Sequence, residues 1–420
     1  MTRPRKRKLT EATVAVGASA PAASVFPAET DVLVRVKSNR LNRAEKGTWL
    51  MVPTELVEPY FAEGLVASRE QIEQVWRQAS SILSPTLIDS QYQRPAYDPS
   101  ALKVLQVTAY DPGSSVYRYS SAANVGGVTS VLVRHGHTNA HCDLRNLDVE
   151  IDAVTVQLLY DTADVVHSHM DYYVVRNVLR QAPRAGQIQC LTYHGSVDPQ
   201  NPGGSIRVNE GKNDDRMDAV VFGARPYHHR FKVKHWLPIP MPVNDYLQLA
   251  KQEKREGKTF RVAHSPTVRR IKGTQEFLRA CDFLTYQMNI EIEPVLIEGL
   301  EHGEALRLKA SCDAVFDSFW LGMQGSGLEG AAMGLPVLAG DPEAQKDLTK
   351  LGIPVPWTVA NDEQGLRDAL AKLATDHTFY AAEAARVHAY VRQYHDYPVV
   401  GQKYADILTE AQRNGPPYRS

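Results

Sequence analysis

The segment HSPTVRRIKGTQEFLRA, residues 264–280, places three cationic side chains next to a glycine. Arg269, Arg270 and Lys272 follow the apolar run FRVAH and precede a stretch with helical spacing, so we expect them on a loop between a strand and a helix. Gly273 allows close approach of the backbone, and the N-terminus of the next helix adds partial positive charge. These features favour a phosphate or diphosphate ligand. An exposed basic loop without a ligand is the alternative.

A carboxylate lies in the glycine-rich segment GSGLEG, residues 325–330. The segment matches the GxGxxG dinucleotide fingerprint, but that fingerprint should follow its strand directly and open a long helix. Here WLGMQ intervenes, and the downstream GLP ends the helix early. We therefore expect Glu329, on the first turn of a short helix, to accept hydrogen bonds from the two hydroxyls of a ribose. The alternative is an acid that interacts only with the helix dipole.

Small residues around this carboxylate would leave room for the ligand. Within GSGLEG we expect the donor ligand to be bound by Gly325, Ser326, Gly327, Leu328 and Glu329. On the opposite side of the ligand we expect Thr274 to cap the helix that follows the basic loop.

The composition is that of a folded protein and excludes several classes. The chain has 420 residues, 43% of them hydrophobic and 23% charged, and a net charge of -1, which argues against binding nucleic acid over the whole surface. The four cysteines are too far apart for a disulfide framework or a zinc site. No apolar run approaches the ~18 residues of a membrane span, and the N-terminus lacks a secretory signal. We expect a cytoplasmic protein without a membrane span.

The first hundred residues differ from the rest. Residues 1–29 carry the basic run RPRKRK and are expected to form a disordered tail, with an arm that grips nucleic acid as the alternative. Residues 30–100 contain the strand-like runs DVLVRV and KGTWLMVP and the helical connector SREQIEQVWRQASSIL. The two strand-like runs and TELVEPYFAEGLV, which has helical spacing, make a ββα-sized unit near residues 30–66 that resembles small accessory modules of bacteriophage proteins.

From residue 101 onward, short apolar runs alternate with helical segments, a pattern typical of parallel sheets buried on both faces. The runs are LKVLQV, ADVVH, IQCLTY and AVVFG in residues 101–240, then TFRVAHS, IEIEPVLI, DAVFDSF and LPVLAG in residues 241–395. The expected fold class is α/β: two tandem doubly wound, Rossmann-like domains that face a cleft, with a small N-terminal α+β appendage. Residues 396–420 are expected to form a helix that packs back across the domains.

Together the two motifs resemble those of retaining glycosyltransferases of the GT-B fold, glycosyltransferase family 4 in particular. In that family an Arg and a Lys near a Lys-Gly step bind the donor diphosphate, and a Glu ahead of A-x-x-G-x-P-V binds the ribose. HSPTVRRIKGT matches the first motif, through Arg269 or Arg270 with Lys272, and GLEGAAMGLPVLA matches the second. Many members carry another Glu near the sugar, where this chain has Leu321. The phage-like module suggests a phage-encoded member.

The resemblance also implies sites in the N-terminal half, where CLTYHGS is similar to a His-Gly loop near the donor sugar. His194 and Gly195 are carried over as catalytic candidates that contact the sugar. His167 and His169 in ADVVHSHMDY, and the pair Gly126 and Gly127 as a glycine loop before a helix, are weaker candidates. A histidine at a strand end is more often structural.

The expected activity is transfer of a sugar from a nucleoside diphosphate sugar, UDP-sugar first, to an acceptor hydroxyl, with retention as the resemblance implies. Protein cations would stabilise the departing diphosphate, and the chain has no Asp-x-Asp pair, so we expect neither a metal nor a permanently bound cofactor. A hydroxymethylated pyrimidine in phage DNA, in the cytoplasm of the host, is the first acceptor hypothesis.

Other functions remain open from the sequence. A cell-surface saccharide or a small molecule is the alternative acceptor. An NAD-dependent oxidoreductase using GSGLEG, a sugar-nucleotide epimerase with the same fold, and a non-catalytic phage protein that binds nucleotide are the alternative classes.

Overall fold

The computed structural model describes residues 31–35, 49–53, 69–81, 92, 96–108, 115–134, 159–169, 186–193, 219–222, 235–255 and 257–414. The chain forms two compact units that divide after Gln74, within helix α2 (Arg69–Ser81). The first unit contains the antiparallel strands β1 (Asp31–Arg35) and β2 (Trp49–Pro53). The predicted strand pairing and connector helix are therefore confirmed.

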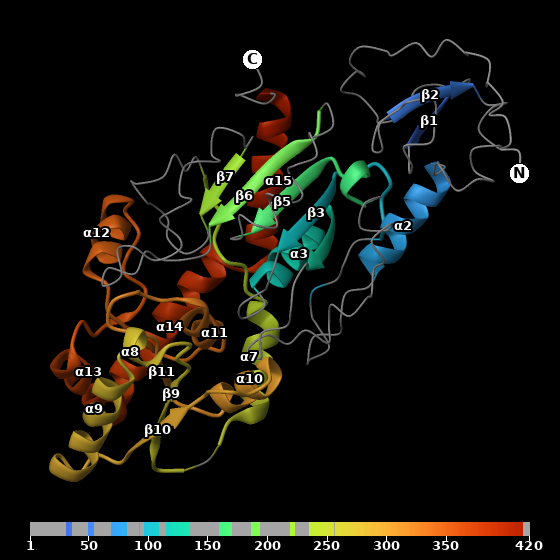
Figure 1. The fold of residues 1–420 in the computed structure, drawn as a ribbon. Helices are drawn as coiled ribbons and strands as arrows, with labels where there is room; N and C mark the ends of the chain where they lie inside the picture. The colour runs from blue at the N-terminus through green and yellow to red at the C-terminus, as the bar shows by residue number, and fades with distance from the viewer. Residues whose placement is uncertain are drawn as a thin grey trace, which may run out of the picture. The chain divides into compact units, whose positions relative to one another are not determined.

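The second unit contains two parallel sheets (Figure 1). The N-terminal sheet has the order β4-β3-β5-β6-β7-β8, and all of its neighbouring strands are parallel. Its strands are β3 (Lys103–Thr108), β4 (Thr129–Arg134), β5 (Val165–His169), β6 (Ile188–Tyr193), β7 (Ala219–Phe222) and β8 (His235–Trp236). Helix α3 (Ser115–Val125) connects β3 to β4.

The C-terminal sheet has the order β10-β9-β11-β12-β13 and is also parallel. Its strands are β9 (Phe260–His264), β10 (Ile292–Leu296), β11 (Ala314–Phe316), β12 (Val337–Ala339) and β13 (Thr358–Val359). The central strands β11 and β12 are completely buried, whereas β10, at the edge, is buried only at some positions. Continuous apolar runs therefore mark the central strands.

Helices connect and cover these strands. They are α7 (Val243–Glu253), α8 (Arg269–Lys272), α9 (Thr274–Gln287), α10 (His302–Ala310), α11 (Gly325–Ala332), α12 (Pro342–Lys350), α13 (Glu363–Thr375), α14 (His377–Tyr394) and α15 (Tyr397–Asn414). No helix among the described residues is long and apolar enough to cross a membrane.

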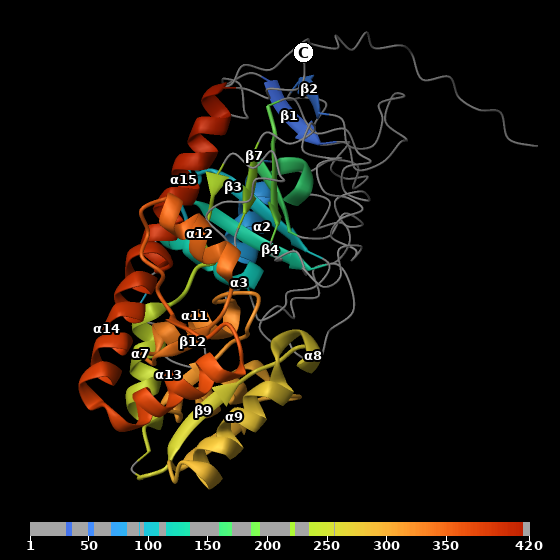
Figure 2. The same ribbon diagram turned by 90° about the vertical axis from the view of Figure 1, so that its left-hand side faces the viewer.

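The C-terminal helices lead the chain back to the N-terminal sheet. Helix α14 contacts α11 and α13, and α15 contacts α3, β6 and β7 (Figure 2). The chain passes between the sheets twice, and the two passages pair: Met241 N donates to His395 O over 2.6 Å. Elements of the N-terminal and C-terminal sheets also contribute to one apolar cluster, which includes Val104 of β3 and Val337 of β12.

Candidate functional site

Helix α11 is held unusually close to the strand that precedes it. A Cβ at Gly327 would lie 2.6 Å from Oδ2 of Asp317, and a Cβ at Gly330 would lie 2.5 Å from the Val315 side chain. Only glycine fits at these separations, since real Cβ atoms do not approach other atoms so closely. Gly327 and Gly330 thus have a packing function, which brings the start of the helix against the carboxyl end of β11.

Asp317 joins the basic loop to α11. Its Oδ2 accepts hydrogen bonds from Gln324 N at 2.6 Å and Gly327 N at 3.0 Å, so the carboxylate binds the N-terminus of the helix. Its Oδ1 lies 2.5 Å from Nζ of Lys272, and both side chains are buried. A negative charge at a helix N-terminus is favourable, and the ammonium of Lys272 further compensates the buried negative charge of Asp317.

Arg269, Arg270 and Lys272 form the short helix α8, so the prediction that they lie on a loop is wrong. The chain turns sharply between α8 and α9. Gly273 has φ 72°, and a Cβ there would lie 2.3 Å from the ring of Phe319. A side chain at this position would be strained and would also displace the ring. The close neighbour of Gly273 is thus a core phenylalanine, and the approach of its backbone to a phosphate stays a prediction.

The expected cap of α9 is wrong. Gly273 holds the N-cap position without a side-chain hydrogen bond, and the Thr274 hydroxyl is bonded to Nε2 of His264 at 2.9 Å instead. Nδ1 of His264 donates to Phe316 O at 3.0 Å, so Nε2 of the neutral ring accepts from Thr274. Burial lowers the pKa of His264 to about 4. This histidine ties the ends of β9 and β11 together, which fixes the start of the loop.

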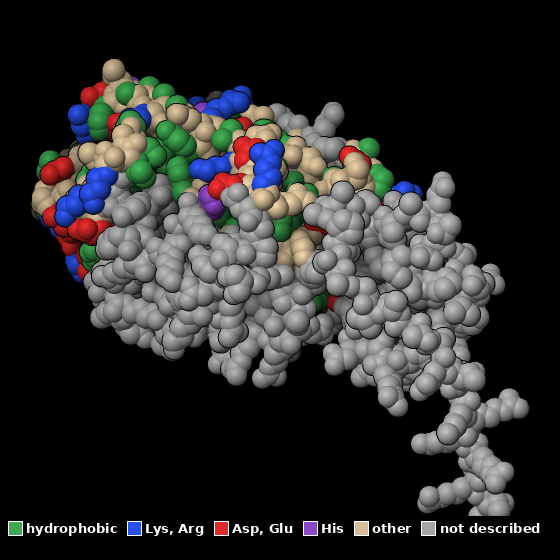
Figure 3. All heavy atoms as spheres, turned by 90° about the horizontal axis from the view of Figure 1, so that it is seen from above, with side chains coloured by type: hydrophobic (Ala, Val, Ile, Leu, Met, Phe, Trp, Pro, Cys, Tyr) green, Lys and Arg blue, Asp and Glu red, His purple; other side chains and the backbone are tan. Residues whose placement is uncertain are grey.

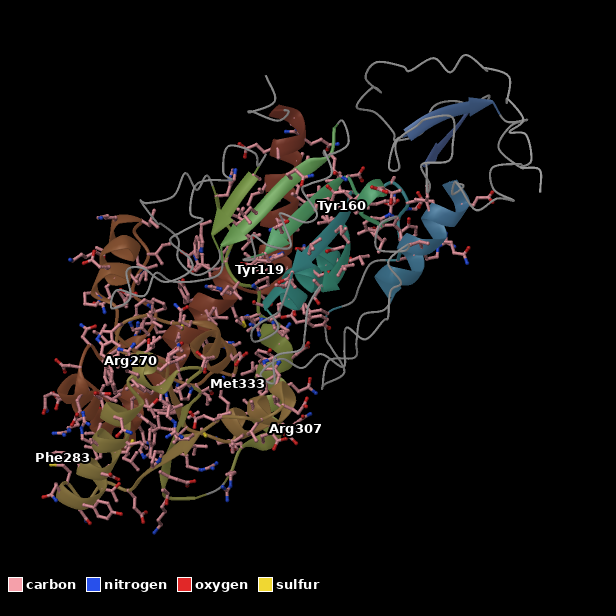
Figure 4. The ribbon with its side chains drawn as sticks, in the orientation of Figure 1. Tyr119, Tyr160, Arg270, Phe283, Arg307 and Met333 are labelled. Carbon is pink, nitrogen blue, oxygen red and sulfur yellow. The ribbon has the colours of Figure 1, made fainter. Side chains whose placement is uncertain are left out.

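The two arginines have different surroundings. Arg269 forms a forked pair with Glu298, in which Nε lies 2.9 Å from Oε1 and Nη2 lies 2.5 Å from Oε2. The hydrogen bond from Arg269 lowers the pKa of the Glu298 carboxyl. Arg270, labelled on α8 in Figure 4, is exposed and makes no hydrogen bond or ion pair with the part of the chain that the structure describes. Of the two, Arg270 is the arginine available for a ligand.

Glu329 lies in the second turn of α11, so the prediction that it lies in the first turn is wrong. Its Oε1 lies 3.1 Å from Nη1 of Arg118 and 3.0 Å from Nε2 of His302, and its Oε2 lies 2.5 Å from Nζ of Lys309. Burial alone would raise the pKa of the Glu329 carboxyl, but Lys309, His302 and Arg118 outweigh it and hold that pKa well below its usual range. The carboxylate is therefore ionised and surrounded by donors.

Both predicted ligand contacts therefore converge on α11. Lys272 is connected to the N-terminus of the helix through Asp317, and Glu329 projects from the following turn. Lys309 links the same two turns, because its Nζ also lies 2.9 Å from the Ser326 hydroxyl. The side chains that the sequence assigned to the two ends of one ligand are assembled around one short helix.

The histidines of the N-terminal sheet have structural partners. His167 is buried within β5 and is bonded to the Tyr404 hydroxyl and to the Thr192 hydroxyl, each at 2.5 Å. His169 Nε2 donates to Gln106 Oε1 at 2.5 Å. These bonds join β5 to its neighbours and to α15. His194 and Gly195 lie outside the described residues.

The glycine pair is placed differently from the expectation. Gly126 and Gly127 follow α3 and precede a strand, so the prediction of a loop before a helix is wrong. A Cβ at Gly126 would lie 2.5 Å from the backbone of Gly401 in α15. Gly126 therefore permits close packing of two helices. A Gly-Gly pair before an apolar run can precede a helix or a strand. Here it follows the helix Ser115–Val125 and precedes β4.

Four important residues of this site were not found from the sequence: Arg118, His302, Lys309 and Asp317. Asp317 directly follows the apolar run AVF, a position that could have indicated a functional carboxylate at a strand end. Arg118, His302 and Lys309 lie in ordinary helical segments and have no distinguishing pattern.

The interpretation of GSGLEG as a false dinucleotide fingerprint agrees with the geometry. Residues 317–324 separate β11 from α11, and the helix ends at Ala332 before Gly334, which has φ 78°. A dinucleotide-binding turn would connect strand and helix directly.

Comparison with known proteins identifies the fold. No protein-family model and no curated protein sequence matches the chain. The structure is similar to that of HepE from Anabaena in complex with UDP and glucose, at 14% identity and a TM-score of 0.51, over 73% of this chain and 99% of HepE. It is also similar to sucrose-phosphate synthase from Thermosynechococcus elongatus, at 12% identity and a TM-score of 0.50, over 74% and 100%. The predicted pair of Rossmann-like domains of GT-B type is confirmed.

Proposed function

We propose that this chain is a glycosyltransferase that moves a sugar from a nucleoside diphosphate sugar to an acceptor hydroxyl. The observation that carries the proposal is the convergence of Lys272 and Glu329 on α11. A cation and a carboxylate so arranged offer a donor for phosphate and an acceptor for ribose hydroxyls within one site. Because UDP is bound in the HepE structure, a UDP-sugar is the first donor to test.

The diphosphate end would be bound by Lys272 and Arg270. An ammonium group has three hydrogens, and Asp317 accepts one from Lys272, so two remain for phosphate oxygens. Arg270 adds a guanidinium that matches two phosphate oxygens at once. Since Asp317 accepts from the N–H groups of Gln324 and Gly327, the side-chain cations supply the main stabilisation of the leaving group.

The reaction exchanges one bond at the anomeric carbon. The bond to the diphosphate oxygen breaks, the nucleoside diphosphate leaves with the electron pair, and the acceptor oxygen bonds to the same carbon as its proton is released. The family resemblance supports retention of configuration. The charge that develops on the diphosphate is balanced by protein cations, with His194 and Gly195 as proposed contacts to the sugar ring and no protein nucleophile assigned.

For the acceptor we keep a hydroxymethylated pyrimidine in DNA as the hypothesis, in the cytoplasm of a host cell if the chain is phage-encoded. It depends on the phage-like module and on the basic tail, residues 1–29, which lies outside the described residues. Lys and Arg side chains lie beside Asp and Glu side chains over the described part of the face in Figure 3. An uncharged acceptor, such as a saccharide, therefore stays the alternative.

The test is a panel of donors and acceptors read by mass spectrometry. UDP-glucose and other nucleoside diphosphate sugars are each incubated with hydroxymethylcytosine DNA, unmodified DNA and simple saccharides. We expect one acceptor to gain the mass of a glycosyl group, with nucleoside diphosphate released only when that acceptor is present. Isomerisation of the donor sugar without any acceptor would identify an epimerase instead, and binding of NAD without binding of UDP would reject the proposal.

A further inference from the structure

The Glu329 carboxylate is almost fully occupied by protein donors. A carboxylate accepts about four hydrogen bonds, two on each oxygen. Arg118 and His302 use both positions of Oε1, and Lys309 uses one position of Oε2. One position is left, whereas a ribose with two adjacent hydroxyls needs two. A ribose can bind Glu329 through both hydroxyls only if one protein donor leaves.

The three donors are not equivalent. His302 and Lys309 belong to α10, which contacts α11 directly, and Lys309 is also bonded to Ser326 of α11. Arg118 belongs to α3, the helix that follows the first strand of the N-terminal sheet, and reaches α11 across the two domains. Displacement of Lys309 would break its hydrogen bonds to both Glu329 and Ser326 of α11. Displacement of Arg118 breaks a contact between α3 and α11, which belong to different domains.

Arg118 is also incompletely bonded. The side chain is buried, yet its Nε has no hydrogen-bond partner among the residues that the structure describes. Its Nη2 lies 3.9 Å from the point where a Cβ of Gly325 would be, so the guanidinium lies along the face of α11 between Gly325 and Glu329. A buried donor without a partner is costly, and the guanidinium is also hydrogen-bonded to the Tyr246 side chain of α7, so it keeps one partner when it releases Glu329.

We propose that Arg118 competes with the ribose of the nucleotide for Oε1 of Glu329, and so sets the affinity for the donor. The inference rests on the proposed function, since it assumes that Glu329 binds a ribose. Binding of the two hydroxyls breaks the link between α3 and α11, so the affinity of the nucleotide is lowered by the free energy of that link. Arg118 is a positioning residue in this scheme, because it acts through Glu329.

The test compares UDP with 2′,3′-dideoxy-UDP, which keeps the diphosphate and lacks both hydroxyls. The dissociation constants of both ligands are measured by calorimetry for the full-length wild-type protein and for Arg118→Met. We expect the ratio of the dideoxy-UDP constant to the UDP constant to rise roughly tenfold in Arg118→Met, the effect of about one charged hydrogen bond. A purely structural role of Arg118 would change both constants alike, and an unchanged or lower ratio overturns the inference.

Two further variants keep the test decisive. Arg270→Met, at the diphosphate end, should weaken both ligands and leave the ratio unchanged. If Arg118→Met does not give a folded protein by circular dichroism, Arg118→Lys takes its place, since it keeps the charge and most of the volume. There we expect a rise in the ratio of roughly threefold, because an ammonium with three donors replaces a planar guanidinium with five. No rise in a folded Arg118→Lys protein overturns the inference.

The outcome separates the two proposals. If the wild-type protein binds neither UDP nor ADP nor GDP, the proposed function fails, and this inference fails with it. If the wild-type protein binds UDP more tightly than dideoxy-UDP but the ratio does not respond to Arg118, only the competition is wrong.

Discussion

Nζ of Lys272 lies 2.5 Å from Oδ1 of Asp317, and the other oxygen of the same carboxylate accepts hydrogen bonds from the N-terminus of α11. The pair is buried, and it connects α8, which follows β9, to α11, which follows β11. Asp317 therefore fixes where the ammonium of Lys272 lies relative to Glu329, two residues beyond Gly327 on the same helix.

Removal of Lys272 should affect both stability and activity. Lys272→Met leaves a buried carboxylate without its cation, so we expect the free energy of unfolding in urea to fall by about 3–5 kcal/mol. The double variant Lys272→Met with Asp317→Asn should lose less than the sum of the two single variants, because no buried charge is left unpaired. Turnover should fall at least about 100-fold in both variants that lack the lysine, because the leaving group loses a cation. Strictly additive losses of stability would contradict the coupling.

The neighbouring arginines should differ in function. We expect Arg270→Gln to weaken UDP binding roughly tenfold, because its guanidinium is exposed and available for phosphate. Arg269→Gln should change the affinity less than about threefold, because Glu298 already engages that side chain. Titration of both variants with UDP measures the difference. Equal losses, or a larger loss for Arg269→Gln, would place the phosphate on the other arginine.

Gly273 and Gly299 have similar backbone conformations but different surroundings, so they allow a controlled comparison of two substitutions. Both have positive φ, 72° and 68°, but a Cβ at Gly273 would overlap Phe319, whereas a Cβ at Gly299 has no described atom within 4 Å. Gly299→Ala should therefore cost about 1 kcal/mol of unfolding free energy from backbone strain alone. Gly273→Ala should cost roughly 2–4 kcal/mol, because the core ring must also move. Urea unfolding of both variants checks this, and equal costs would show that Phe319 yields freely.

His264 should make the protein less stable in mild acid. Its pKa is about 4 in the folded state against an ordinary value of 6.5, because burial disfavours the charged ring. Between these values the unfolded chain binds more protons, so the free energy of unfolding falls as the pH drops from about 6.5 towards 4, by up to ~1.4 kcal/mol per pH unit from this residue.

The control variant for this effect is His264→Asn, whose amide can still donate to Phe316 O. Its unfolding free energy, measured in urea from pH 7 to pH 4.5, should fall less steeply than that of the wild type by about the contribution of one histidine. His395, whose pKa burial also lowers to about 4, remains in both proteins and leaves a residual slope. Identical slopes would mean that His264 titrates normally.

The sequence alone indicated the two parallel sheets, because runs such as AVVF, DAVF and PVLA alternate with helical segments, as in sheets that helices cover on both faces. It also determined that Lys272 and Glu329 follow strands β9 and β11, since a glycine and an early helix stop are local signals. These features depend on residues that are close together in the sequence, so they can be predicted from local patterns.

Only the tertiary structure decided what surrounds the two side chains. Asp317 lies far from Lys272 in the sequence, and Arg118 lies further still from Glu329, so each pair exists only because the strands and helices fold together. The same reason explains Gly126, which faces Gly401 at the other end of the chain. A contact between distant segments cannot be predicted from the residue spacing within either segment, because its geometry is set by the packing of whole helices and strands.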